Sequence, residues 1–119
     1  MAARILIVDD HPSFRASARA LLEADGFEVV GEAEDGHSAV ASAQALLPDV
    51  VLLDVQLPDI DGFEVAERLR DHAGAPAVVL TSSREASDYG GLPQRSGACG
   101  FVPKGELSGD GIASLLPWA

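Results

Sequence analysis

Short apolar runs recur at fairly even spacing along this chain and alternate with segments of helical period. The runs that predict strands are Ile5–Val8, Phe27–Val30, Asp49–Leu53, Ala77–Leu80 and Phe101–Val102. These runs are continuous rather than alternating, which indicates strands that are buried on both faces. Such strands are typical of a parallel sheet with helices on each side.

Apolar residues at helical spacing lie between the runs and predict the covering helices. The first stripe is Phe14, Ala18, Leu21 and Leu22, the second is Val40, Ala43 and Leu47, and the third is Phe63, Ala66 and Leu69. Glycine or proline follows each stripe, at Gly26, Pro48, Gly74 and Pro76. The pattern predicts an α/β fold of five βα units, (βα)5, with a doubly wound parallel five-stranded sheet in the flavodoxin-like order 2-1-3-4-5.

Glycine and proline crowd the last third of the chain and weaken its helical pattern. Gly90, Gly91 and Pro93 fall within the expected fourth helix, near Ser87–Arg95. An interior glycine costs about 1 kcal/mol of helix stability relative to alanine. We therefore expect a short or irregular fourth helix and a weak fifth helix, near Leu107–Leu116.

Length and charge narrow the classes of function. The 119 residues fit one domain, residues 1–119, and eight basic against nineteen acidic residues give a net charge of −11. Such a chain repels nucleic-acid phosphates and anionic membrane surfaces, so we expect no direct nucleic-acid binding and no membrane association. The single cysteine, Cys99, and an N-terminus unlike a signal peptide favour a cytoplasmic location.

Acidic residues follow two of the expected strands. Asp9 and Asp10 come after the first strand, and Asp54 comes after the third. These strands are neighbours in the expected order, so the three carboxylates should converge. Helix capping explains any one acid alone, but three converging carboxylates repel each other and favour a hard cation such as Mg²⁺. Gln56 is placed to offer its backbone carbonyl to the same ion.

Two further polar residues are expected at the same edge of the sheet. Thr81 offers a hydroxyl at the end of the fourth strand, although strand propensity alone would also explain a threonine there. Lys104, the only lysine, follows the fifth strand and is either a surface residue or a point contact for a phosphoryl oxygen or carboxylate. Between the third strand and third helix, Pro58 favours a turn and Gly62 permits close packing.

Other residues receive simpler interpretations. The histidines, His11, His37 and His72, lack a spacing typical of metal sites, and we expect them at the surface, with His11 at the edge of the acidic site. Asp59 and Asp61 are interpreted as solvated loop acids. Trp118 either packs on the sheet or is an exposed contact, and the closing SLLPWA suggests a chain that stops after the fifth helix.

Taken together, these segments resemble the receiver domain of two-component response regulators, the CheY-like fold. The motifs are ILIVDDHPSFR, VVLLDVQLPDIDG, VVLTSS and SGACGFVPKGEL, in this order over nearly the whole chain. DDHP and GFVPK are most similar to receivers that precede a helix-turn-helix output domain. The resemblance implies a signalling phosphoprotein rather than an enzyme, with a sensor histidine kinase or a phosphotransfer protein as its partner. Any DNA-binding output would lie on a partner or outside this sequence.

The resemblance also implies a role for each acid of the expected site. Asp54 would be the phosphoacceptor and would carry the aspartyl phosphate. Asp9 and Asp10 would hold Mg²⁺ together with Asp54 and the Gln56 carbonyl. Mg²⁺ is therefore the one cofactor that we expect.

The remaining site residues would sense the phosphoryl group. Thr81 would hydrogen-bond it, Lys104 would pair with one of its oxygens, and Phe101 would turn inward as Thr81 moves. This switch would alter the face made by the fourth helix, fifth strand and fifth helix, and a homodimer through that face is one arrangement that the resemblance implies. The chain departs from the family in having Phe101 without a tyrosine hydroxyl, and in having Pro103 before the lysine where many receivers have proline after it.

Three alternatives remain at this stage. An aspartate-based phosphohydrolase would carry a DxD motif after the first strand, whereas this chain has Asp9-Asp10 there and Gln56 two residues past Asp54. A flavin module would need a hydroxyl- and glycine-rich phosphate loop in place of DDHPSFR. A receiver-like interaction module that works without phosphorylation is opposed by the complete set of site residues.

Overall fold

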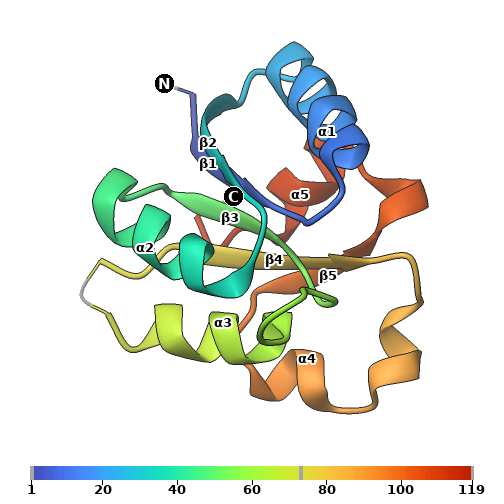
Figure 1. Cartoon of the computed structure of the whole chain (residues 1–119). Helices are drawn as coiled ribbons and strands as arrows, with labels where there is room; N and C mark the ends of the chain where they lie inside the picture. The colour runs from blue at the N-terminus through green and yellow to red at the C-terminus, as the bar shows by residue number, and fades with distance from the viewer. Residues whose placement is uncertain (1, 73, 119) are drawn as a thin grey trace.

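Five parallel strands form one sheet in a computed structural model that describes residues 2–72 and 74–118 (Figure 1). The strands are β1 (Arg4–Val8), β2 (Glu28–Ala33), β3 (Val50–Asp54), β4 (Ala77–Ser82) and β5 (Gly100–Pro103). Their order in the sheet is β2-β1-β3-β4-β5, and each neighbouring pair is parallel. The predicted fold class and strand order are confirmed.

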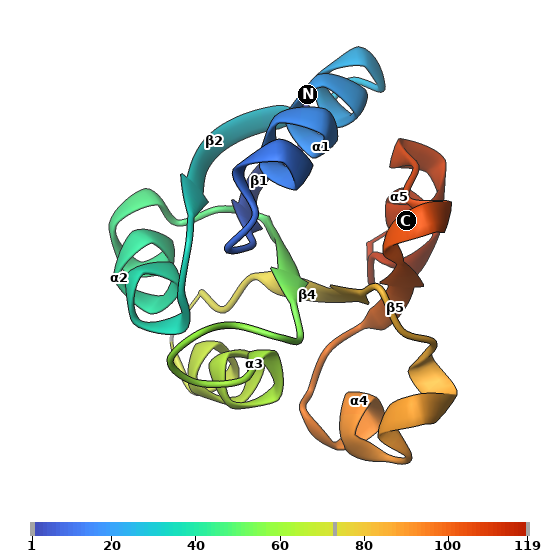
Figure 2. The ribbon, with the colours of Figure 1, turned by 45° about the vertical axis from the view of Figure 1, so that its right-hand side comes forward.

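Helices cover both faces of this sheet (Figures 1 and 2). One face carries α1 (Pro12–Ala24) and α5 (Gly109–Leu115), and the other carries α2 (Gly36–Leu46), α3 (Gly62–Arg70) and α4 (Leu92–Arg95). There are two short 3₁₀ segments: η1 (Ala86–Tyr89) lies between β4 and α4, and η2 (Lys104–Glu106) follows β5. None of the helices in the described ranges is long and apolar enough to cross a bilayer.

The central strands bury both of their faces, as their continuous apolar runs predict. In β1, Leu6 and Val8 pack in the core that includes α2 and α3, while Ile5 and Ile7 pack on the opposite side with Ile112 of α5. Burying one such side chain contributes roughly 1.5–3 kcal/mol to folding. The sheet is therefore a rigid platform for the loops at its carboxyl edge.

The segment between β4 and β5 is irregular, as expected from its glycines. It contains only η1 and α4, which have four residues each. Gly90 joins them with φ 59°, a left-handed conformation that favours glycine. Pro93 lies in the first turn of α4, where proline is tolerated, and is buried. The fifth helix is also short, with seven residues.

Leu47 does not belong to the buried face of α2, so that part of the predicted stripe is wrong. The helix ends at Leu46, and Leu47 is its C-cap residue, with φ 49° and an exposed fraction of 64%. Ala39 and Ala43 form the buried face of the helix instead. Pro48 cannot continue the helix, and a left-handed Leu47 turns the chain toward β3.

The loop from β3 to α3 packs tightly against the end of the sheet. The Gly62 N–H donates to the Val55 carbonyl at 2.8 Å. A Cβ atom on Gly62 would press on the Asp54 carbonyl oxygen and lie 2.8 Å from Val55 Cα, so the predicted close packing is confirmed. Asp61 is exposed in the loop before α3, as expected. It also accepts from the Glu64 N–H at 2.9 Å and caps this helix.

We expect Gly62→Ala to lower the free energy of unfolding by roughly 1–3 kcal/mol, because the added methyl group meets rigid backbone. Urea unfolding followed by circular dichroism measures this change. Gly105→Ala is the matched control, because a methyl group there meets nothing within 4 Å. Equal unfolding midpoints for Gly62→Ala and the wild-type chain would contradict the packing argument.

Candidate functional site

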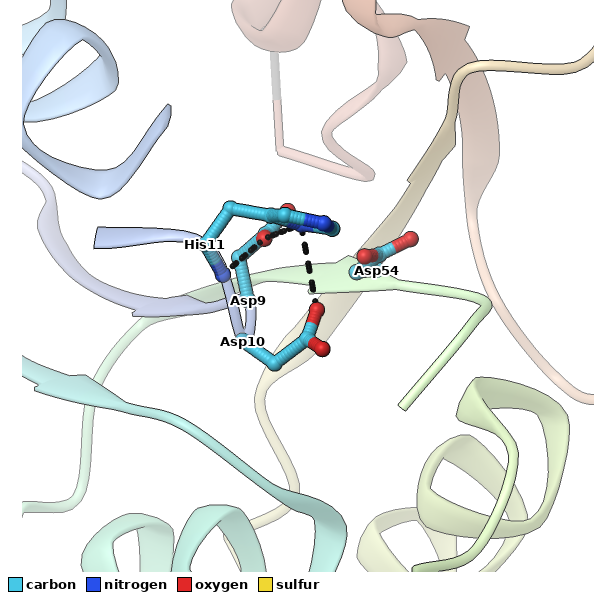
Figure 3. Close-up of side chains that lie close together, drawn as sticks. All are labelled: Asp9, Asp10, His11 and Asp54. Carbon is cyan, nitrogen blue, oxygen red and sulfur yellow. Dashed lines mark hydrogen bonds and ion pairs between the residues drawn. The ribbon is translucent and has the colours of Figure 1, made fainter. Parts of the chain in front are cut away.

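Three carboxylates converge at the carboxyl edge of the sheet, as the strand order predicts. Asp9 and Asp10 follow β1, and Asp54 is the last residue of the neighbouring strand β3. One side-chain ligand atom from each acid, together with one from His11, lie within 4.8 Å of one another (Figure 3). Because four such groups gather at one point, capping of separate helices does not account for them.

The backbone around Asp9 holds its side chain inside the protein. The Asp9 N–H donates to the Ala33 carbonyl at 3.0 Å and continues the pairing of β1 with β2. Arg15 Nη1 donates to the Asp9 carbonyl at 2.6 Å, and Arg15 Nε pairs with Glu32 at 3.0 Å. Asp9 and Asp54 are buried, with exposed fractions of 0% and 2%, whereas Asp10 is exposed to solvent.

Lys104 neutralises part of the charge of the two buried acids. Its ammonium nitrogen lies 2.6 Å from Asp9 Oδ2 and 3.4 Å from Asp54 Oδ2, and it also sits over the Phe14 ring. Although burial alone would lower the pKa of Lys104, the two carboxylates raise it above its usual range. The single lysine is therefore an element of the site rather than a solvated surface residue.

The two buried acids have opposite protonation behaviour. Burial, aided by the charge of Asp9, raises the pKa of Asp54 to about 6, against the opposing hydrogen bond from the Gln56 N–H. Burial also acts on Asp9, but the Lys104 ammonium and the His11 N–H outweigh it and hold the pKa of Asp9 below its usual range. Asp9 is thus the stably ionised acid, and Asp54 ionises at the cost of burying a second charge.

Thr81 lies beside Asp54 and has an unused hydroxyl. The two residues are register partners in β3 and β4, and Thr81 is fully buried. Its Oγ1 has no hydrogen-bond partner among residues 2–72 and 74–118. A buried, unpaired hydroxyl costs about 1–3 kcal/mol, so strand propensity alone is a poor account of this residue. The hydroxyl is therefore placed to donate a hydrogen bond to a group that binds at Asp54.

Tyr89 is a residue of this region that the sequence reasoning missed. Its ring packs edge-on against Phe63 at 5.4 Å and lies 6.0 Å from the half-buried Phe101. Its hydroxyl and Ser82 Oγ are hydrogen-bonded at 2.7 Å. Tyr89 therefore ties η1 to the strand that carries Thr81. No sequence motif signals this contact, which depends on the path of the irregular segment.

Asp59 is an exposed loop acid, as expected, but it also binds the backbone of a neighbouring helix. Its carboxylate accepts from the Gly36 N–H at 2.7 Å and the His37 N–H at 2.9 Å, at the N-terminus of α2. Its pKa lies well below the usual range, because these N–H groups outweigh the effect of burial. Asp59 thereby fastens the loop that follows Asp54 to a neighbouring helix.

The donor set fits a hard divalent cation. Ionised carboxylates are the oxygen ligands that Mg²⁺ accepts, and three of them with one lysine leave the site negatively charged. The N–H of Gln56 points to Asp54 Oδ1 at 3.1 Å, and the role of its carbonyl stays a prediction. Trp118 is 57% exposed and lines a hollow with Ala2, Ala3 and Asp49, at the opposite edge of the sheet.

The comparisons with known proteins agree with this geometry. The family model for the response regulator receiver domain matches residues 5–114. The chain is 36% identical over 110 residues to the DNA-binding transcriptional activator EvgA of Escherichia coli K12, covering 92% of this chain and 54% of EvgA. It is 38% identical over 103 residues to BvgA of Bordetella pertussis, covering 87% and 49%. The chain thus spans about half the length of the curated relatives that it matches.

A solved structure supports the same fold. The two-component response regulator of the LuxR family from Aurantimonas sp. SI85-9A1 superposes with a TM-score of 0.86 at 32% identity. The superposition covers 97% of this chain and 86% of the other. The fold of the chain thus matches the fold of that regulator.

We expect Asp54→Asn to raise the free energy of unfolding at neutral pH, on the order of 1–3 kcal/mol, when divalent cations are removed. The pKa of Asp54 rises from its ordinary value of 3.8 to about 6 in the folded chain, so the folded chain holds this proton more tightly. The ionised carboxylate therefore destabilises the fold progressively as the pH rises through that window, and fully above it.

Urea unfolding at several pH values in a chelator tests this expectation. The advantage of Asp54→Asn should be small near pH 4 and should reach its plateau above about pH 6. Asp110→Asn is the control, because Asp110 is exposed and its replacement removes no buried charge. An advantage for Asp54→Asn that does not change with pH would contradict the assignment.

Proposed function

This chain belongs to the response regulator receiver domain family, and on that premise we propose that residues 1–119 form one receiver domain whose Asp54 accepts a phosphoryl group in the presence of Mg²⁺. A receiver is a signalling phosphoacceptor of a two-component system rather than an enzyme. The observation that carries the proposal is the convergence of Asp9, Asp10 and Asp54 with Lys104 at one edge of the sheet.

The transfer uses Asp54 as its nucleophile. A carboxylate oxygen bonds to the phosphorus of a phosphohistidine, the N–P bond breaks, and its electron pair returns to the imidazole of the donor. Such transfers are catalysed mainly by positioning and by neutralising charge. Asp9, Asp10, Asp54 and the Gln56 carbonyl would hold Mg²⁺, which would supply most of that neutralisation.

Lys104 contributes the second positive charge. Its nitrogen is 3.4 Å from Asp54 Oδ2, so it lies next to any group that bonds to this carboxylate. A compact ammonium on a flexible stem can pair with one phosphoryl oxygen while it remains near the acids. The Phe14 ring beneath it and the partial burial of its side chain keep the ammonium in place.

Thr81 and Phe101 form the switch that responds to the phosphoryl group. The unpaired hydroxyl of Thr81 donates to a phosphoryl oxygen, which draws the end of β4 inward. Ser82 follows Thr81 in the chain and is bonded to Tyr89, whose ring packs near Phe101. Phe101 has no hydroxyl with which to make a polar contact. In this chain, the Tyr89 hydroxyl makes such a contact with Ser82 and couples β4 to η1.

The switched surface is made by α4, β5 and α5. Strand β5 is at the edge of the sheet and pairs with one neighbour, and α4 and η1 have four residues each. Neither feature provides much regular hydrogen bonding to hold this region in one conformation. A cytoplasmic histidine kinase or phosphotransfer protein is the proposed donor, and a homodimer through this face is the proposed response. The names of the relatives describe transcription regulators, so we assign the receiver to the control of transcription through an output domain.

We expect acetyl phosphate with Mg²⁺ to add one phosphoryl group to the wild-type chain, because the site presents an ionisable nucleophile beside bound positive charge. Intact-mass spectrometry measures the adduct. Asp54→Asn or excess chelator should abolish it, whereas Asp71→Asn, which replaces an exposed acid, should retain it.

Two results would contradict the proposed function. Labelling that survives in Asp54→Asn would place the acceptor elsewhere. A wild-type chain that takes no label from acetyl phosphate or from histidine kinases would favour the interaction module that works without phosphorylation.

We expect Tyr89→Phe to retain phosphorylation of Asp54 but to weaken the response of Ala86–Arg95, because it removes only the bond to Ser82. Amide chemical-shift changes between the free and phosphorylated states measure that response. Ser87→Ala is the control, since it changes an exposed hydroxyl in the same segment. Unchanged shifts in Tyr89→Phe relative to the wild-type chain would rule out the coupling.

A further inference from the structure

The imidazole of His11 lies at the solvent-facing edge of the acidic site and turns toward two of its carboxylates (Figure 3). Its Nδ1 is 2.8 Å from Asp9 Oδ1 and 3.1 Å from Asp10 Oδ1. The His11 N–H also donates to Asp9 Oδ1 at 2.8 Å and fixes the backbone beneath the ring. The prediction that His11 is a surface residue at the edge of the acidic site is confirmed, because 63% of its side chain remains accessible.

This orientation is not explained by helix capping. His11 is the N-cap residue of α1, yet its side chain makes no capping hydrogen bond in the described chain. The ring turns instead toward Asp9, which is fully buried and whose Oδ2 has only the Lys104 ammonium beside it. The imidazole thus adds a nitrogen to a cluster of carboxylate oxygens that could hold one ion.

The spacing of these atoms matches the spacing of ligands around one ion. Adjacent ligands of an octahedral ion with bonds of about 2.1 Å are about 3.0 Å apart. The two distances from His11 Nδ1 to the carboxylates bracket this value. Ionised carboxylates only accept hydrogen bonds, so Nδ1 is the donor in its contacts with Asp9 and Asp10. A bound cation would take the place of this donated hydrogen. The other tautomer frees Nδ1 as a ligand and places the proton on the solvent side.

A nitrogen ligand changes which ion such a site prefers. Oxygen ligands alone suit Mg²⁺, whereas imidazole favours divalent ions of the first transition row. We propose that His11 is a further metal ligand and that this site binds a divalent transition ion of the Mn²⁺ and Co²⁺ class in preference to Mg²⁺. The inference rests on the proposed function, because it concerns the same acids, but it adds a residue and a different ion.

His37 offers a matched comparison on the same surface. Its Nδ1 also lies close to a carboxylate, at 2.6 Å from Asp59 Oδ2, and its side chain is about as exposed as that of His11. Asp59, however, already accepts hydrogen bonds from two backbone N–H groups. Among the described residues, neither Asp59 nor His37 belongs to a cluster that could hold a metal ion. His37 should therefore not affect metal binding.

The test compares the wild-type chain with His11→Gln and His37→Gln. Calorimetric titrations with MgCl₂ and CoCl₂ give the ratio of the two affinities for each protein. Pulsed electron paramagnetic resonance of bound Mn²⁺ detects coupling to a directly bound ¹⁴N nucleus. This second measurement uses the wild-type chain, so it decides the matter even where a variant folds poorly.

We expect ¹⁴N coupling in the wild-type chain and in His37→Gln, and none in His11→Gln. The preference for Co²⁺ over Mg²⁺ should fall at least about tenfold in His11→Gln, as expected for the loss of a ligand, and stay unchanged in His37→Gln. Absence of ¹⁴N coupling in the wild-type chain, or an equal preference in all three proteins, would overturn the inference.

The proposed function can fail separately. A wild-type chain that binds Mg²⁺ and takes a phosphoryl group on Asp54, but shows no ¹⁴N coupling, overturns only the role of His11. A chain that binds Co²⁺ with ¹⁴N coupling but takes no phosphoryl group supports His11 as a ligand and contradicts the proposed function.

Discussion

Two like charges buried side by side are the constraint on which this site depends. Asp9 and Asp54 lie at the ends of adjacent strands, almost without contact with solvent, and Lys104 is the cation that touches both. Their repulsion is tolerated because the strands beneath them are fixed by burial on both faces. The repulsion between the two carboxylates favours the binding of a further positive charge at the site, next to Lys104.

The surroundings of Asp54 are rigid on one side and loose on the other. On the side of α2 and α3, Gly62 packs against the end of β3 and Asp59 fastens the loop to α2. Toward β5, the chain runs through the short segments η1 and α4, where the Tyr89 hydroxyl is bonded to Ser82 of the sheet. Under the proposed function, a change at Asp54 would be transmitted toward α4 and β5 rather than toward α2.

Some features of the site could be predicted because they follow from strand position alone. Acids directly after Val8 and within the VVLLD run must meet once the first and third strands are neighbours. Thr81 and Lys104 follow from the same rule at the next two strands. The buried position predicted for Leu47 was wrong, and the contacts of Asp59 with α2 were not predicted. Both cases concern a loop or a helix end, where long-range contacts override the local pattern.

The sequence by itself determined the (βα)5 architecture, the strand order and the set of residues at the carboxyl edge, because hydrophobic period and residue order act locally and recur along the chain. Only the tertiary structure decided what those residues do to each other. It placed Lys104 between two acids, His11 against Asp9, and Tyr89 on Ser82. These pairs form between side chains whose directions depend on the packing of the whole fold, and no local pattern encodes that packing.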